Sequence, residues 1–439
     1  MIKQLLVVCI TLCSLVAVAQ RGTATPYSFY GLGSLNLKGT VENRSMGGIS
    51  VYLDSIHINL RNPAAYVGKN VEAFPFDNES RPVKFSVAGT FSNTTLKSNS
   101  GEAETGTAIF DYLAFSIPIG KLGFGFGLLP FTTVGYQLDD INDNGDLINR
   151  YSGSGGLNRV FFGLGYQITD KLSAGVDINY NFGNVENSAI ELAYAQDGDL
   201  VQFQTREDSR SELRGLNLNF GLAFKTMLNE KLELSLTTTY APVSNLISEN
   251  QRALTNIIYN QELDIQTDVS AIDIDLASQN LEETDLTLPS RLSFGAGIGN
   301  PLRWFVGAEY TLQNTSEFSN PFYANQATAF ENASQISVGG FYIPNYRAFS
   351  GYFKRVVYRA GFNYSNTGLV IKGEPINEFG ISFGLGLPVG TRALFSNANV
   401  GIEYGQRGTT NENLIQENFL TLNLSLSLNS RWFRQRKYD

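Results

Sequence analysis

The sequence contains few residues that could perform catalytic chemistry. His57 is the only histidine among 439 residues, and the only cysteines, Cys9 and Cys13, lie in the first 20. A serine nucleophile needs a base beside it, and His57 lies in an irregular N-terminal stretch rather than on a regular strand. A chain that loses its first residues would have no disulfide, thiolate metal site or cysteine nucleophile. The sequence therefore predicts no enzyme, catalytic residue or cofactor.

One acidic stretch matches the first half of a calcium-binding loop. Oxygen-bearing side chains alternate at Asp140, Asn142, Asn144 and Asp146, as ligands do around Ca²⁺. The twelfth position of the motif is Tyr151 rather than glutamate. A turn-rich loop without metal is therefore the preferred interpretation, and a calcium site is the alternative.

The first 19 residues are typical of an export signal. Lys3 precedes an apolar run from Leu5 to Val16, and the small residues Ala17 and Ala19 allow cleavage after position 19. The apolar run is too short for a membrane-spanning helix. Loss of Lys3 takes the formal net charge from −9 to −10, which argues against a nucleic-acid partner.

Alternation of apolar and polar residues dominates the rest of the chain. The clearest case is 419–429, where every second residue from Leu420 to Leu428 is leucine and the residues between are Thr, Asn and Ser. A strand alternates its side chains with period two, so one face is all leucine. A soluble sheet would bury that face, whereas a membrane barrel turns it to lipid. Similar alternation occurs at 83–91, 122–128, 164–168, 172–182, 216–224, 232–236, 292–298, 304–310, 356–362, 381–387 and 400–404.

The pattern predicts an all-β fold, a transmembrane antiparallel β-barrel of about 14 strands, with 12 or 16 as alternatives. No later stretch is apolar enough for a spanning helix, and only closed barrels can place strands in lipid. Short connections near 120, 170, 229, 300 and 390 alternate with long ones at 137–155, 187–211, 243–284, 313–332, 366–375 and 406–417. This alternation is typical of periplasmic turns and outer loops. A weak strand at 334–342 is needed to keep the strand number even.

The predicted organisation has four parts. Residues 1–19 form the signal peptide, 20–76 an N-terminal hatch, 77–433 the outer-membrane barrel and 434–439 a basic periplasmic tail. The inward face is rich in Gly, Ser and Asn, which leaves room for the hatch inside the barrel. Arg431, Trp432 and Phe433 follow the last strand, where an aromatic girdle is expected.

Short motifs resemble the FadL-type outer-membrane proteins. They are Arg44-Ser45-Met46-Gly47-Gly48 and Asn62-Pro63-Ala64-Ala65 near the N-terminus, and 221–232, 288–295 and 304–310 in the barrel, while the ending at 432–439 resembles members from Bacteroidota. The resemblance implies a monomeric fourteen-stranded barrel with a hatch. It also implies uptake of long-chain fatty acids or other hydrophobic compounds, with a lateral opening at a kinked third strand. Another branch resembles PorV-type proteins, which are partner subunits in secretion.

The resemblance gives candidate residues for ligand passage: Asn62, Pro63 and Ala64 in the hatch, and Pro130 in the third strand. Proline lacks a backbone donor and breaks a ladder bond, although Pro130 could instead mark the strand's outer end. Lumen-facing Lys225, Arg303 and Arg359 could bind an anionic head group or pair with acidic neighbours.

We therefore predict a bacterial outer-membrane channel for hydrophobic small molecules. Its expected partners are membrane lipids, the ligand and further outer-membrane or periplasmic subunits. The alternative is a non-transporting structural or adaptor subunit of a secretion or assembly complex, and a general porin is a weaker third interpretation. The acidic stretch 243–284 does not favour a fatty carboxylate.

Overall fold

The computed structural model describes residues 24–35, 39–54, 56–67, 82–142, 144–261, 263–323, 328–389 and 396–430. The predicted signal peptide, the Arg431–Phe433 girdle and the basic tail lie outside these residues. None of the described helices is long and apolar enough to cross a membrane.

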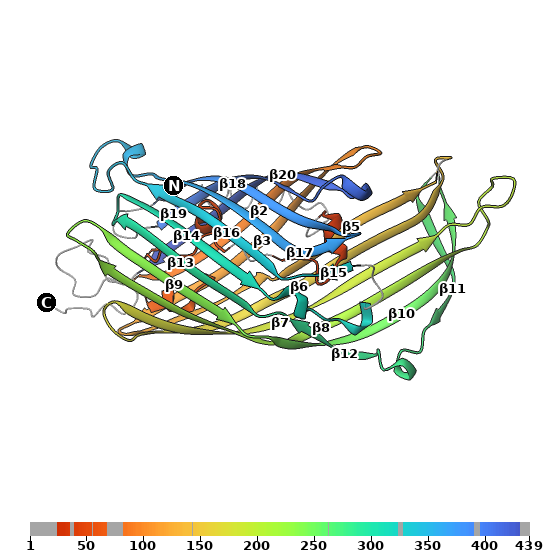
Figure 1. The fold of residues 1–439 in the computed structure, drawn as a ribbon, viewed down its shortest axis with the longest axis horizontal. Coiled ribbons are helices and arrows are strands. Elements are labelled where there is room, and N and C mark those ends of the chain that lie inside the picture. Colours follow the sequence, from red (N-terminus) through yellow and green to blue (C-terminus); the bar gives the residue numbers. More distant parts are fainter. Residues whose placement is uncertain are drawn as a thin grey trace.

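Within the described residues, fourteen antiparallel strands form the wall of a closed barrel (Figure 1). Three of the fourteen consist of two segments each: β4 with β5, β9 with β10, and β12 with β13. The wall segments are β2 (Val83–Lys97), β3 (Glu102–Ile119), β4 (Leu122–Pro130), β5 (Thr132–Ile141), β6 (Leu147–Gln167), β7 (Leu172–Glu191), β8 (Gln204–Met227), β9 (Glu233–Ala241), β10 (Ser244–Asn260), β12 (Glu283–Leu288), β13 (Arg291–Asn300), β14 (Trp304–Gln313), β16 (Ala333–Tyr342), β17 (Val357–Ile371), β18 (Glu374–Val389), β19 (Ser396–Arg407) and β20 (Gln416–Ser430).

The remaining elements are short or lie outside the wall. They are β1 (Ser34–Leu35), β11 (Ile265–Asp273), β15 (Thr328–Phe330), the helix α2 (Val41–Arg44) and the single-turn helices η1 (Pro26–Phe29), η2 (Pro63–Val67), η3 (Ala277–Gln279), η4 (Thr315–Glu317), η5 (Pro321–Tyr323), η6 (Tyr352–Lys354) and η7 (Asn411–Asn413). The barrel closes where β2 pairs with β20, from Val83 opposite Ser430 to Lys97 opposite Gln416. The predicted all-β barrel with fourteen strands is confirmed, including the weak strand at 334–342, which is β16.

The strand faces follow the predicted alternation. In β20, Leu420 is 54 % exposed, whereas its neighbours along the strand Asn423, Ser427 and Asn429 are buried. In a barrel with this pattern the leucines face lipid and the polar residues face the lumen. The chain is therefore an outer-membrane β-barrel.

The wall extends beyond the membrane at the end opposite the short turns. The outward side chains of β8 are apolar from Leu216 to Leu222 but charged at Arg206, Asp208 and Arg210. Charged side chains cost about 2–4 kcal/mol on the lipid face at mid-membrane, so this half of β8 lies outside the bilayer. The predicted loop 243–284 is wrong, because β10, β11 and β12 occupy most of it and continue this extramembrane sheet (Figure 1).

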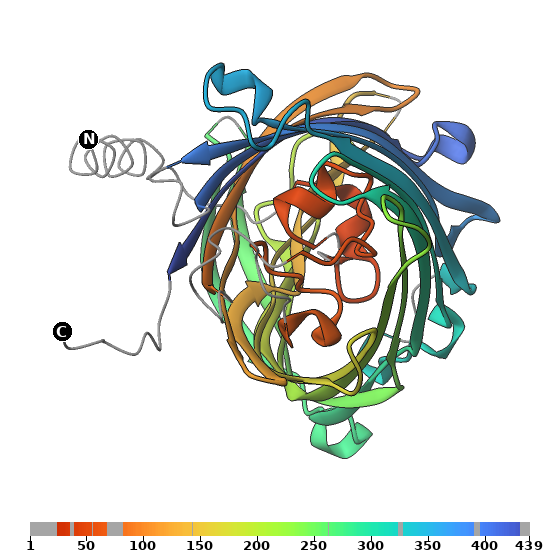
Figure 2. The ribbon, with the colours of Figure 1, turned by 90° about the vertical axis from the view of Figure 1, so that its left-hand side faces the viewer.

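The described residues between 24 and 67, here called the inner segment, lie inside the barrel (Figure 2). Val41, Ile58 and Tyr66 of this segment pack with Tyr112 and Phe161 of the wall in one buried cluster. Glycines of the wall allow the close approach: a Cβ at Gly123 would lie 2.2 Å from the backbone oxygen of Tyr66, and one at Gly339 would lie 2.2 Å from that of Met46. At these positions the backbone of the inner segment packs directly against the glycine-rich wall.

Candidate functional site

The third wall strand is interrupted at Pro130. Pairing between β3 and β4 ends at Leu113 opposite Leu128, while β4 pairs with β6 as far as Pro130 opposite Asn158. The strand resumes as β5, which pairs with β6 but not with β3 among the described residues. The outer half of β3, Glu102–Tyr112, therefore has a wall neighbour only in β2, and the ladder of the barrel is open there.

The inner segment occupies the edge of β5 that faces this break. Ser34 and Leu35 of β1 pair with Thr133 and Thr132 of β5. Gly33, with φ of +87°, brings the chain so close that a Cβ there would lie 2.5 Å from the Thr133 carbonyl oxygen. Only glycine adopts that conformation without strain. The break in the wall is thus partly covered from inside by a two-residue strand.

The other side of the break is held by a bulge in β3. The register between β2 and β3 shifts between Ala88 and Gly89, and as a result Asp111 and Tyr112 are both buried although they are adjacent. Asp111 forms an ion pair of 3.2 Å with Arg44 of the inner segment. The Tyr112 hydroxyl accepts a hydrogen bond from the backbone of Val41. The bulge therefore turns a carboxylate into the lumen, where it binds the inner segment.

A cavity of about 330 Å³ lies against the break and the inner segment. Its apolar lining combines aromatic and aliphatic side chains and includes Tyr30, Leu129, Phe131, Phe161, Phe318 and Phe330. Its charged lining consists of five arginines (44, 61, 159, 291 and 407) and three carboxylates (111, 177 and 378), so the formal charge of the lining is +2. A cavity with apolar walls and excess positive charge suits a molecule that has an apolar body and an anionic head.

Two of these arginines have no carboxylate within ion-pair distance in the described part of the chain. Arg159 donates from Nε to Asn181 at 2.9 Å and its guanidinium lies 3.7 Å above the ring centre of Phe131. The side chain of Arg291, which is half-buried, has no hydrogen bond or ion pair to any described residue. Because the charge of Arg159 meets only neutral amides and that of Arg291 meets no side-chain partner, these two guanidinium groups are the groups available to an anionic ligand.

The three other arginines of the lining are paired. Arg44 contacts Asp111, Arg61 contacts Glu309 at 2.5 Å and Arg407 contacts Glu378 at 2.5 Å. Arg159 and Arg291 were not among the cations considered from the sequence as binders of an anionic head group. Those were Lys225, Arg303 and Arg359. Lys225 pairs with Glu233 at 2.6 Å, Arg359 donates to Asn399 at 3.0 Å and Arg303 lies in the 301–303 turn.

The hatch candidates Asn62, Pro63 and Ala64 anchor the inner segment elsewhere. Asn62 donates to the Leu222 carbonyl at 3.1 Å, and Ser173 donates to the Ala64 carbonyl at 3.0 Å. A Cβ at Gly175 would lie 2.6 Å from the Pro63 carbonyl oxygen. These contacts lie on β7 and β8 near the short turns. Pro130 ends β4 eight residues beyond Leu122, roughly 26 Å along the strand, so the structure does not bring the two sets together.

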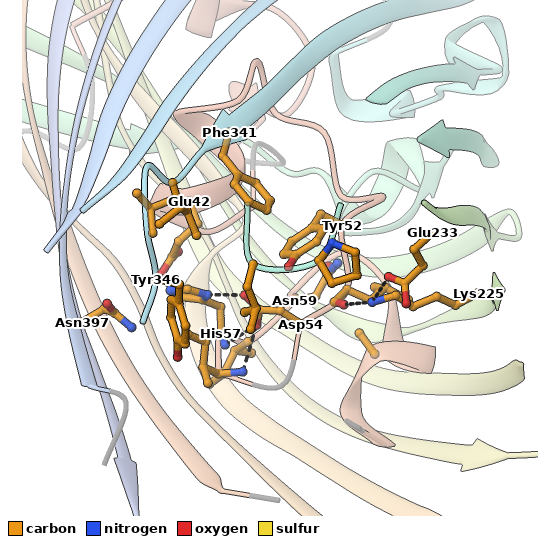
Figure 3. A pocket seen from close by; sticks show the side chains of 18 of the residues that line it. Glu42, Tyr52, Asp54, His57, Asn59, Lys225, Glu233, Phe341, Tyr346 and Asn397 are labelled. Atoms are coloured by element: carbon orange, nitrogen blue, oxygen red, sulfur yellow. Dashed lines mark hydrogen bonds and ion pairs between the residues drawn. The ribbon is translucent and has the colours of Figure 1, made fainter. Parts of the chain in front are cut away.

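A second cavity, of about 980 Å³, opens at the short-turn end (Figure 3). Its lining includes Tyr52, Phe341 and Tyr346 beside Asp54 and His57. His57 Nδ1 lies 2.5 Å from Asp54 Oδ2. Burial acts to raise the pKa of Asp54, but the charge of His57 and its hydrogen bonds, together with Lys84, lower it below its usual range. His57 is thus engaged within the inner segment.

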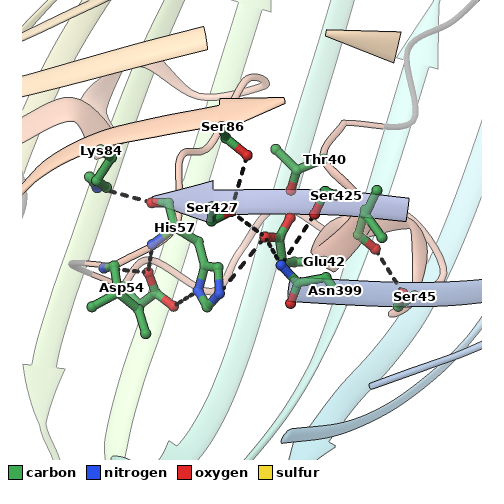
Figure 4. Close-up of polar contacts among 12 residues, drawn as sticks. Thr40, Glu42, Ser45, Asp54, His57, Lys84, Ser86, Asn399, Ser425 and Ser427 are labelled. Atoms are coloured by element: carbon green, nitrogen blue, oxygen red, sulfur yellow. Dashed lines mark hydrogen bonds and ion pairs between the residues drawn. The ribbon is translucent and has the colours of Figure 1, made fainter. Parts of the chain in front are cut away.

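Carboxylate and amide groups tie the same region to the wall (Figure 4). Glu42 accepts hydrogen bonds from Asn399 at 2.7 Å and from Ser427 at 3.2 Å. Lys84 donates to the His57 carbonyl at 2.9 Å. Strands β2, β19 and β20 are therefore joined to the inner segment by buried polar contacts.

Asp140 belongs to the end of β5, and residues 142 and 144–146 lie in the turn between β5 and β6. Asn142 donates to Asp146 at 3.0 Å, and Asp139 pairs with Arg150 at 2.8 Å. The residues that the structure describes include no group of three or more acidic, histidine or cysteine side chains that could hold a metal ion.

Comparison with known proteins supports the fold. The family model described as BamG matches residues 1–439, and no curated protein matches the chain. The CymD monoaromatic hydrocarbon channel aligns with 91 % of this chain and 100 % of its own at 12 % identity and a TM-score of 0.53. The Ralstonia pickettii toluene transporter TbuX aligns with 90 % and 100 % at 14 % identity and 0.56. A Pseudomonas aeruginosa FadL homologue aligns with 89 % and 98 % at 12 % identity and 0.52.

Proposed function

From the cavity beside the interrupted strand we propose that the chain, which belongs to the BamG family, is an outer-membrane channel for hydrophobic small molecules. The proposed ligand has an apolar chain and an anionic head, as a long-chain fatty acid does. Solved barrels of similar fold include channels for toluene and other monoaromatic hydrocarbons.

One observation carries the proposal: an amphipathic cavity with two arginines that have no carboxylate partner among the described residues adjoins the break in the β-ladder between β3 and β5. The apolar body of a ligand would lie against Phe131 and Phe161, and its head would meet Arg159 or Arg291. Hydrogen bonds to charged groups contribute about 1.5–3 kcal/mol each, which corresponds to roughly 10- to 100-fold in affinity.

Ligand release to the membrane would use the break itself. Among the described residues, β1, which pairs with Thr132 and Thr133, and Ser28, whose hydroxyl hydrogen-bonds the backbone of Gly135, cover that edge of β5. Withdrawal of residues 28–35 would open a lateral path between β3 and β5 without breaking any pairing between wall strands. Passage along the barrel axis would instead require the whole inner segment to move.

The test is binding of hexadecanoate and of hexadecanol, which share a chain but differ in head charge, to the protein purified in mild detergent. We expect hexadecanoate to bind at least tenfold more tightly, and Arg291→Met to remove that preference. Arg291 has no partner that the variant would leave unsatisfied. Arg210→Met, an exposed position on the extramembrane sheet, is the matched control. Absence of binding by both compounds would refute the channel proposal.

A second candidate function is a structural or adaptor subunit of an outer-membrane secretion or assembly complex. The observation that favours it is the number of buried contacts that fix the inner segment to opposite sides of the wall. Arg61 pairs with Glu309 of β14, Arg44 with Asp111 of β3, and Glu42 binds Asn399 of β19. A segment held in this way suits a closed barrel.

Purification of the tagged native protein, followed by mass spectrometry of its proteins and lipids, separates the two candidates. A bound anionic amphiphile without a stoichiometric protein partner supports the channel. A stoichiometric partner with no bound amphiphile supports the subunit.

A further inference from the structure

The hairpin of β10 and β11 leaves one free strand edge outside the membrane. β11 (Ile265–Asp273) pairs with β10 from Asp273 opposite Ala253 to Ile265 opposite Asn260. No other described strand pairs with it. Nine residues at about 3.3 Å each give roughly 30 Å of edge, along which backbone N–H and C=O groups have no strand partner. Figure 1 shows this hairpin at the end of the barrel that lies opposite the short turns.

This edge lies above the bilayer. The adjoining stretch of β10 pairs with Gln204–Asp208 of β8, in the half of β8 whose outward side chains are charged. Lipid therefore does not account for the apolar side chains on the hairpin. Ile265 is 53 % exposed, Val269 51 % and Ile272 67 %, and Leu254 of β10, opposite Ile272, is 39 % exposed.

The edge also lacks most of the devices that keep strands apart. Natural edge strands are protected by lysine, proline, bulges or a covering element. β11 contains no lysine, arginine or proline, and eight of its nine residues are exposed. Its protective features are the bulge at Val269, opposite Asn256 and Ile257, and the carboxylates of Asp268 and Asp273.

The charged side chains of the edge strand and its flanks are all acidic. Residues 264–275 contain four aspartates and no cation. Asp264 and Asp268 pair with Arg150 and Arg206, whereas Asp273 and Asp275 have no ion pair among the described residues. A second copy of the chain would bring four more carboxylates to the same edge, so like-charge repulsion disfavours self-pairing.

We propose that the β11 edge is a docking site for an extended, basic segment of another cell-surface protein, which adds to the sheet as a further strand. Main-chain hydrogen bonds would supply affinity, as in other strand additions. Apolar side chains of the segment would lie beside Ile272, and a lysine or arginine would face Asp273 and Asp275. This inference does not depend on transport and holds for either function proposed above.

The test uses a ten-residue peptide of alternating lysine and valine, added to the purified full-length protein in detergent. Hydrogen exchange should show protection of the amides in 265–273 when the peptide is bound. The same peptide with alternate backbone nitrogens methylated should bind at least tenfold more weakly, and so should a peptide of alternating glutamate and valine. The variant Ile272→Lys/Asp273→Lys should weaken binding of the lysine peptide by at least tenfold.

The matched control is Ile258→Lys, which adds one cation on the outward face of β10, away from the edge, and should retain most of the binding. Equal binding of the methylated peptide would show attraction by charge alone and overturn strand addition. Absence of binding would overturn the site. A dimer of the unmodified protein that the Ile272→Lys/Asp273→Lys variant abolishes would identify a second copy as the occupant instead.

Discussion

Replacement of Glu309 by glutamine is expected to release the inner segment while the barrel remains closed. Glu309 is 4 % exposed and contacts Arg61 at 2.5 Å. Its other oxygen accepts hydrogen bonds from the backbone and the hydroxyl of Ser50, both at 2.8 Å. One wall side chain therefore holds two points of the inner segment that lie eleven residues apart.

The magnitude follows from what the variant leaves behind. Glutamine can still accept from Ser50, but Arg61 becomes a buried cation without its carboxylate. Removal of one partner from a buried ion pair costs about 3–5 kcal/mol, which is roughly 10²- to 4 × 10³-fold in a local opening equilibrium. The cost applies to the inner segment, because the pairing of β14 with β13 and β16 is untouched.

Hydrogen exchange of the protein in detergent measures this opening. Amides of residues 49–62 should exchange at least 100-fold faster in Glu309→Gln, while those of β14 should change less than threefold. The double variant Arg61→Met/Glu309→Gln removes both charges and should recover a large part of the protection. Exchange of 49–62 within threefold of the unmodified protein would show that this ion pair does not hold the inner segment.

Four further outcomes are expected. Gly33→Ala should weaken the β1 pairing, because its Cβ would meet the Thr133 carbonyl at 2.5 Å, and exchange at Thr132 and Thr133 should rise at least tenfold; an unchanged rate would contradict the proposed covering of the break. Pro130→Ala, which restores a backbone donor, should reduce uptake of a labelled fatty acid while heat-resistant migration of the barrel is retained; unchanged uptake would exclude the lateral path. The variant Val51→Cys/Gly295→Cys, combined with Thr237→Ala to make room, should form a disulfide between the inner segment and β13, because the two Cβ atoms would lie 3.5 Å apart. Uptake that is equal before and after reduction of this disulfide would show that this part of the inner segment need not move. His57 and Lys84 lower the pKa of Asp54 against the opposing effect of burial, so the contribution of Asp54 to the stability of the inner segment is present in full above about pH 4 and falls as the pH drops further. Residues 50–59 should therefore exchange faster in Asp54→Asn than in the unmodified protein at pH 7, and this difference should shrink below pH 4. A difference independent of pH would exclude the charge of Asp54 as its cause.

The barrel could be predicted because one physical contrast, lipid against lumen, acts on nearly every strand. The five leucines of β20 alternate with polar residues, as the apolar residues of β7 and β18 do. That the barrel is closed followed from the need to pair every backbone donor in lipid. The contrast weakens above the membrane, because the outward face of a strand meets water there instead of lipid, while inward side chains such as Ile257 and Tyr259 pack in an apolar cluster. Residues 253–273 therefore show mixed polarity without a marked face, and the strands β10 and β11 were mistaken for an acidic loop.

The cavity beside the break could not be predicted from the sequence, for a different reason. Arg159 and Arg407 are both inward-facing arginines on barrel strands, and nothing local distinguishes them. Only the register of neighbouring strands places Glu378 and Glu417 beside Arg407, while asparagines 181 and 217 lie beside Arg159. Pro130 indicated where the ladder could break, because proline removes a donor regardless of context. Residues 34 and 35 cover the break because they pair with Thr133 and Thr132 of β5, almost one hundred positions later in the sequence. They belong to a segment without regular alternation, so no local pattern indicates this pairing. Charge pairing and covering are thus properties of register and long-range contact, and it is these two properties that make one cavity in the barrel fit for an anionic amphiphile.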